Sequence, residues 1–207
     1  GERPVHAALE QHIRGLLPLL GELPESRRTL LDDVAFFVSS RRAIGENTDL
    51  VFICTHNSRR SQLGQLWATA AAAHFGVDGI RAYSGGTEVT AFNPRAIAAA
   101  ERAGFRVANP GGENPRYRIS FDDAAAPLVC FSKTYDDPSN PAVDFVAVMT
   151  CSEADEACPV VLGAARRAPI RYEDPKASDD TPEETASYDA RSRQIATEML
   201  YLFSRIA

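Results

Sequence analysis

The strongest constraint on the fold is an alternation of short apolar runs with segments of helical pattern, which starts near residue 49. Near-continuous apolar strands that alternate with helices are typical of a parallel sheet covered on both faces. We therefore expect a three-layer α/β/α fold with a central parallel sheet of about four strands. The predicted strands are 50–54, 80–84, 127–133, 145–150 and 168–172, the predicted helices are 61–76, 94–105 and 181–206, and 109–120 is predicted to be a loop.

The first 48 residues show no strand pattern and predict two amphipathic helices. Their apolar stripes contain Leu9, Ile13, Leu16, Leu17 and Leu20, and then Leu30, Leu31, Val34, Phe37 and Val38. An apolar stripe has to be buried, so we expect these helices to pack on the rest of the chain, with a homodimer through them as the alternative. The chain is thus divided into an N-terminal helical extension, 1–48, and a main domain, 49–207.

Composition narrows the functional classes. The chain has 207 residues, a net charge of −6 and no basic cluster, which argues against nucleic acid as a partner. It has no apolar run of about 18 residues, so no membrane span is predicted. The first 20 residues do not resemble a signal peptide, and we expect a cytoplasmic protein. Without a secretory signal, the four cysteines favour catalysis, metal binding or simple burial over structural disulfides.

The segment VFICTHNSRRSQ, residues 51–62, carries the main chemical prediction. Cys54 ends a buried strand, and the loop after it leads directly into a helix. Such a loop directs backbone N–H groups and the positive end of the helix dipole inward, which makes an oxyanion cradle and favours a thiolate. The guanidinium of Arg60 can hold two oxygens, and the Ser61 hydroxyl can donate to the thiolate. The cradle comprises Thr55, His56, Asn57, Ser58, Arg59 and Arg60.

The segment is therefore predicted to be a nucleophile and an anion site in one unit. The alternative is that Cys54 is a small buried residue and Arg60 a surface charge. The position of the motif between a strand and a helix makes this alternative the weaker one.

The loop CTHNSRRS resembles the phosphate loop of the low-molecular-weight protein tyrosine phosphatases. It resembles still more closely that of the thioredoxin-coupled arsenate reductases, which share this fold. The resemblance extends from about Leu50 to the C-terminus and includes YSGGTEV (83–89), NPRAI (93–97) and the pair Asp174–Pro175. It implies that 49–207 is a catalytic domain and that Asp174 is the general acid for the leaving group. An aspartate after the last strand could supply that proton, although Asp174 could instead cap a turn, and Glu173 ranks second.

The segment TCSEADEACP, residues 150–159, separates the two enzyme classes. It resembles the part of the arsenate reductases that holds their second and third redox cysteines, here Cys151 and Cys158. The resemblance implies a disulfide relay from Cys54–Cys151 to Cys151–Cys158, which a thioredoxin-type reductant then reduces, with no tightly bound cofactor. Burial of both cysteines is the alternative. A zinc site is disfavoured because no further ligand lies nearby, so no metal is predicted. Cys130 lies in an apolar run and is predicted to be a packing residue.

Three features depart from the family pattern. His56 stands where the family usually has glycine, so it would strain the loop if its φ were positive, and it could contact substrate. Arg59 lacks the motif spacing and is expected to face outward or to guard the entrance. The segment 107–143 is longer than in the minimal fold, and its Asp136 and Asp137 are either solvated or part of the rim.

Because elements at the rim decide which ester or oxyanion fits, these additions leave more than one substrate class possible. The first choice is an arsenate reductase that uses Cys54, Cys151 and Cys158 with thioredoxin. The alternative is a low-molecular-weight tyrosine phosphatase that uses Cys54, Arg60 and Asp174 on phosphate monoesters. A third interpretation is a non-catalytic oxyanion-binding or redox-sensing module.

Overall fold

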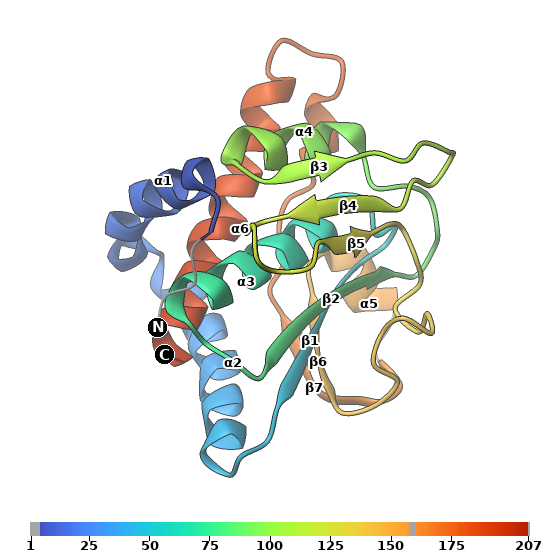
Figure 1. Ribbon diagram of the computed structural model, residues 1–207. Helices are drawn as coiled ribbons and strands as arrows, with labels where there is room; N and C mark the ends of the chain where they lie inside the picture. Colours follow the sequence, from blue (N-terminus) through green and yellow to red (C-terminus); the bar gives the residue numbers. More distant parts are fainter. Residues whose placement is uncertain (1–4, 158–159, 207) are drawn as a thin grey trace.

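A computed structural model describes residues 5–157 and 160–206 (Figure 1). Its centre is a four-stranded parallel sheet with the strand order β2-β1-β6-β7. The strands are β1 (Thr48–Cys54), β2 (Ile80–Gly86), β6 (Phe145–Met149) and β7 (Ala164–Pro169). Cys54 pairs with Gly86, and Ile53 pairs with Met149. The segments that follow β1, β2 and β6 therefore emerge at one edge of the sheet, which is the ligand edge in open α/β sheets.

The two faces of the sheet are covered unequally. On one face Leu50 and Phe52 of β1 belong to the large core, which includes residues of α3 (Arg60–Phe75), α4 (Pro94–Ala103) and α6 (Glu184–Ile206). On the other face Val51 and Ile53 join a smaller cluster with Ala154 of the short helix α5 (Ser152–Ala157). This alternation along β1 is the period of two that a strand buried on both faces requires. The predicted fold class is confirmed.

The N-terminal segment forms α1 (Ala7–Leu16), a 3₁₀ turn η1 (Leu17–Glu22) and α2 (Glu25–Ala43), which lie beside α6 (Figure 1). The buried stripe residues of α1 and α2 belong to the same core as the sheet. The expected packing on the rest of the chain is therefore confirmed. The proposed division at residue 48 and the homodimer both stay predictions. The buried residues of both apolar stripes already pack against other parts of the same chain.

The segment 106–130 was predicted only in part. It forms a second, antiparallel sheet, β3-β4-β5, beside β2 and α3 (Figure 1). Its strands are β3 (Arg106–Ala108), β4 (Tyr117–Ser120) and β5 (Leu128–Cys130). The predicted loop 109–120 thus ends in a strand, because Tyr117 and Ile119 are buried while Arg118 between them is exposed. The strand expected at 127–133 is shorter and lies outside the central sheet.

The last strand of the central sheet also differs from the prediction. The expected strand 168–172 is instead β7, which begins at Ala164, and Ile170 and Tyr172 are buried just beyond its end. The two arginines in AARRAP concealed this edge strand, since they interrupt its apolar pattern. Among the described residues, no helix combines the length and the apolar character needed to cross a membrane.

Candidate active site

Cys54 is buried at the end of β1, and the loop after it enters α3 at Arg60. The Cys54 sulfur lies 2.9 Å from Ser61 Oγ. Asn57 Nδ2 donates to the same oxygen at 2.8 Å, so the Ser61 hydroxyl hydrogen is left to point at the sulfur. A donor aimed at sulfur stabilises a thiolate, which is the form that attacks. The geometry agrees with the role predicted for Ser61.

Backbone strain in the loop lies at Asn57 and not at His56. Asn57 has φ = +50°, a region that asparagine tolerates better than most residues, whereas His56 has no positive φ. The Asn57 side chain is fully buried, and its Oδ1 accepts from Gln62 Nε2 and from the backbone N–H of Lys133, each at 3.1 Å. His56 instead points its half-exposed imidazole to Glu88, with Nε2 3.1 Å from the carboxylate. His56 is therefore a rim residue, and the condition for strain there, a positive φ, is not met.

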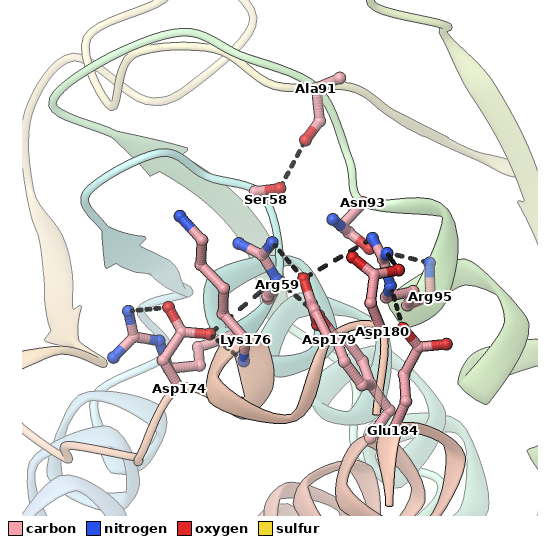
Figure 2. Close-up of polar contacts among 12 residues, drawn as sticks. Ser58, Arg59, Ala91, Asn93, Arg95, Asp174, Lys176, Asp179, Asp180 and Glu184 are labelled. Atoms are coloured by element: carbon pink, nitrogen blue, oxygen red, sulfur yellow. Dashed lines mark hydrogen bonds and ion pairs between the residues drawn. The ribbon is translucent and has the colours of Figure 1, made fainter. Parts of the chain in front are cut away.

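The connection after β2 supports the loop from outside. Thr87 and Glu88 donate their backbone N–H groups to the Thr55 carbonyl at 2.8 and 2.9 Å. A Cβ at Gly86 would stand 2.6 Å from that carbonyl oxygen, which explains the glycine in YSGGTEV. Ser58 Oγ donates to the Ala91 carbonyl at 2.6 Å (Figure 2). These contacts fix the loop from the side of the β2 connection.

Arg60 connects the phosphate loop with the segment after β7. Its guanidinium is buried, and Nη1 donates to the Tyr172 carbonyl at 3.1 Å. Nη2 donates to Asp174 Oδ2 at 3.2 Å, while Nε has no hydrogen-bond partner among the described residues. An anion bound by this guanidinium would lie beside the Asp174 carboxylate. The structure therefore brings together the predicted nucleophile, anion-binding arginine and general acid.

The position of Asp174 is compatible with both roles considered from the sequence, a turn cap and a general acid. Its Oδ1 accepts from the backbone N–H of Lys176 at 3.0 Å and caps η2 (Pro175–Ser178), and its Oδ2 faces Arg60. Glu173 is not paired with Arg60. Its side chain is 92% exposed, and its carboxylate lies 3.4 Å from the Arg191 guanidinium. The ranking of Asp174 above Glu173 agrees with this geometry, and its catalytic role stays a prediction.

Arg59 does not face outward, so the first of its two expected positions is wrong, while a role at the entrance stays a prediction. Its side chain is only 11% exposed and donates from Nε to Tyr188 Oη at 2.8 Å. It also lies 3.5 Å from Asp179 and 3.9 Å from Asp174 (Figure 2). The physical reason is the acidic segment after β7, which folds back over the loop. Arg59 therefore ties the segment that carries Asp174 to the phosphate loop.

A second arginine strengthens this connection. Arg95 of α4 pairs with Asp179, Asp180 and Glu184, at 3.6, 3.0 and 2.5 Å (Figure 2). Tyr188 Oη in turn donates to Asp179 Oδ1 at 2.7 Å. The sequence analysis missed Arg95, Asp179 and Tyr188. Arg95 stands in the motif NPRAI, which gave no indication of an ion pair, and the acids between residues 179 and 184 are by themselves typical of a solvated turn.

Cys151 follows β6 at the ligand edge and is fully buried, with 0% exposure. Its sulfur lies 3.6 Å from Thr55 Oγ1, in the residue next to Cys54, and accepts from the backbone N–H of Ala154 at 3.3 Å. Thr150 fixes this position, because its N–H and its hydroxyl both donate to the Ile53 carbonyl at 2.8 Å. The second predicted redox cysteine thus lies beside the phosphate loop, while Cys158 lies outside the described residues.

The acids between the two cysteines are partly neutralised. Asp155 accepts hydrogen bonds from Arg171 Nε at 2.8 Å and from Arg167 Nε at 3.1 Å. Although burial opposes it, these two arginines lower the pKa of Asp155. Asp155 therefore adds little uncompensated negative charge near Cys151. Cys130, in contrast, is fully buried in β5, and burial raises the pKa of its thiol to about 12, as suits a packing residue.

Comparisons with known proteins show what this chain is similar to. Residues 49–115 match the family model of the low molecular weight phosphotyrosine protein phosphatases. An arsenate reductase of Bacillus licheniformis is 26% identical over 155 residues, which cover 75% of this chain and 94% of the relative. An arsenate reductase of Bacillus subtilis is 27% identical over 148 residues, which cover 72% of this chain and 88% of the relative.

A solved structure with the same fold is the low molecular weight protein tyrosine phosphatase from T. tengcongensis. Its TM-score is 0.50 at 14% identity, covering 76% of this chain and 99% of that one. The predicted resemblance to the phosphatase and arsenate reductase superfamily is confirmed. The expectation of an enzyme is also confirmed, because the matching family and these relatives are enzymes, and the non-catalytic interpretation loses support.

Proposed function

We propose that the chain is an arsenate reductase that uses Cys54, Cys151 and Cys158 with a thioredoxin-type reductant. The observation that carries this proposal is the buried Cys151 sulfur, 3.6 Å from Thr55 in the phosphate loop. A phosphatase of this fold needs only one thiol at the ligand edge. The relatives named arsenate reductase support the same choice over most of their length.

In the first step, the Cys54 thiolate attacks arsenic while Arg60 and the backbone N–H groups of residues 55–60 hold the arsenate oxygens. An S–As bond forms and an As–O bond breaks. Asp174 gives its proton to the departing oxygen, which leaves as water. The contact between Asp174 and Arg60 supports this role, because an oxyanion held by Arg60 would lie beside the Asp174 carboxyl group.

In the second step, the Cys151 thiolate attacks the Cys54 sulfur. An S–S bond forms, and the electrons of the S–As bond stay on arsenic, which leaves as arsenite. Cys158 then attacks Cys151 and releases the Cys54 thiolate, and a thioredoxin-type dithiol reduces the Cys151–Cys158 disulfide. Seven helical positions would separate two Cα atoms by about 10 Å, and a disulfide needs less than about 7 Å, so α5 has to unwind.

The second candidate is a phosphatase that hydrolyses phosphate monoesters through a Cys54 phosphocysteine. The match of residues 49–115 to a phosphotyrosine phosphatase family favours it. Cys54, Arg60 and Asp174 would suffice, with Asp174 protonating the leaving alkoxide. Cys151 would then be a buried packing residue.

The test is arsenate-dependent NADPH oxidation with thioredoxin and thioredoxin reductase. We expect wild-type turnover to be lost in Cys151→Ser and Cys158→Ser, and retained in the matched control Cys130→Ala. Hydrolysis of an aryl phosphate should survive in Cys151→Ser and disappear in Cys54→Ser. Aryl phosphate hydrolysis by a wild-type enzyme that cannot turn over arsenate would refute the reductase and establish the phosphatase.

A further inference from the structure

A cavity of about 680 Å³ lies apart from the Cys54 site, between α3, β2 and the region of β5. Neither the phosphate loop nor Asp174 lines it. Its walls are largely apolar and include Ala68, Ala72, Val77, Leu128 and Phe203. Its volume falls in the range of about 300–1,000 Å³ that is typical of sites for small molecules.

One buried cation lines this cavity. Lys133 is only 5% exposed, and within residues 5–157 and 160–206 no carboxylate lies within ion-pair distance of its ammonium. Asp137 acts on Lys133 from a distance, but its own carboxylate accepts the N–H and hydroxyl of Ser139 at 2.9 and 2.7 Å. Burial lowers the pKa of Lys133, which reflects the cost of this charge. A buried charge without a partner is normally avoided, so an anion would relieve a cost already present.

An aromatic ring lies next to this charge. The Lys133 ammonium is 4.9 Å from the centre of the Phe131 ring, and the Arg116 guanidinium is 4.3 Å from it. Arg116 is exposed, so water screens its charge, whereas Lys133 is largely withdrawn from water. The cavity therefore offers one desolvated positive charge beside an apolar surface. One negative charge would balance it, and a dianion would leave a buried surplus.

We propose that this cavity binds a monocarboxylate with an apolar body, either a medium-chain fatty acid or an aryl carboxylate. The carboxylate pairs with Lys133, and the body packs against Phe131 and the alanines of α3. This site goes beyond the reductase proposal, and its test by direct binding does not depend on that activity.

The same residues also support the phosphate loop. The Phe131 carbonyl accepts from Gln62 Nε2 at 3.0 Å, and Ser132 Oγ donates to the His56 carbonyl at 2.8 Å. The Lys133 backbone N–H donates to Asn57 Oδ1. A ligand in the cavity would thus contact side chains of the segment whose backbone holds the loop around Cys54.

The experiment is isothermal titration calorimetry of the full chain with decanoate, at concentrations where decanoate is monomeric. Lys133→Met keeps the apolar stem and removes the charge, so it should weaken binding about tenfold or more. Ala72→Phe fills the cavity without changing charge and should remove binding. Arg118→Met changes an exposed arginine of β4 that does not line the cavity, and it should bind as wild type does.

A second titration separates this site from the phosphate loop. Saturating inorganic phosphate should not displace decanoate, because the two sites share no lining residue. The proposal is overturned if wild type fails to bind decanoate, if Lys133→Met binds equally well, or if phosphate competes. Circular dichroism verifies that each variant is folded, and Ala72→Phe keeps the proposal testable should Lys133→Met not fold.

Discussion

The contact between α2 and α6 allows a direct test of how the N-terminal helices contribute to stability. Arg27 donates from Nε and Nη2 to the two carboxylate oxygens of Glu198, at 3.0 and 2.8 Å. Glu198 is only 1% exposed, and within the described residues its one further partner is the Tyr172 hydroxyl, at 2.8 Å. Arg27→Met would leave a buried carboxylate without its cation. Breaking a buried pair in this way costs about 3–5 kcal/mol of unfolding free energy.

The assay is urea unfolding followed by circular dichroism, with the free energy extrapolated to water. Arg14→Met is the matched control, because Arg14 pairs with Glu10 on the surface of α1 with a side chain that is 71% exposed. Such an i,i+4 pair contributes about 0.5 kcal/mol or less. The double variant Arg27→Met with Glu198→Gln should recover a large part of the loss, since no charge is then buried alone. Equal small losses for Arg27→Met and Arg14→Met would refute the reasoning.

Four further predictions concern the active site and its surroundings. Ser61→Ala should slow alkylation of Cys54 by iodoacetamide at neutral pH about tenfold, because the thiolate loses a donor, and mass spectrometry of the modified peptide measures this. Asp174→Asn should lower kcat about 100-fold for substrates with poor leaving groups and far less for activated aryl phosphates; an equal loss for both would contradict its role as the acid. Arg59→Gln should lower kcat/KM about tenfold with little change in alkylation of Cys54, since it frees the acid-bearing segment and not the nucleophile. Cys130 should resist thiol reagents at pH 8 in the native protein and react after denaturation, because burial raises its pKa to about 12, and thiol titration with and without urea measures the difference.

The unit from β1 through the phosphate loop to α3 could be predicted because its signals are local. The apolar run that ends in Cys54 and the left-handed Gly76 at the end of α3 both lie at the elements they define. Local signals of this kind need no knowledge of the rest of the chain. The carboxyl-end rule then placed Asp174 and Cys151 at the same edge of the sheet.

The errors arise from contacts between residues far apart in the sequence. Arg59 faces inward because Tyr188 and Asp179 return to it more than 100 positions later, and no spacing rule encodes that return. The second sheet was missed because β3, β4 and β5 are three or four residues long, too short for a clear period. The positive φ lies at Asn57 because Ser61, Gln62 and Lys133 hold its side chain, which only the folded loop reveals.

The hydrogen bonds from residues 131–133 to the phosphate loop bear on any attempt to shorten the enzyme. Gln62 and Asn57 are fully buried, and both depend on backbone groups from the segment that follows β5. Deleting the extra length to reach a smaller catalytic unit would remove one hydrogen bond from each of these two buried amides, at a loss of about 0.5–1.5 kcal/mol each. Residues 131–133 are thus part of the framework that holds the phosphate loop, and a shortened chain would need other groups to make these contacts.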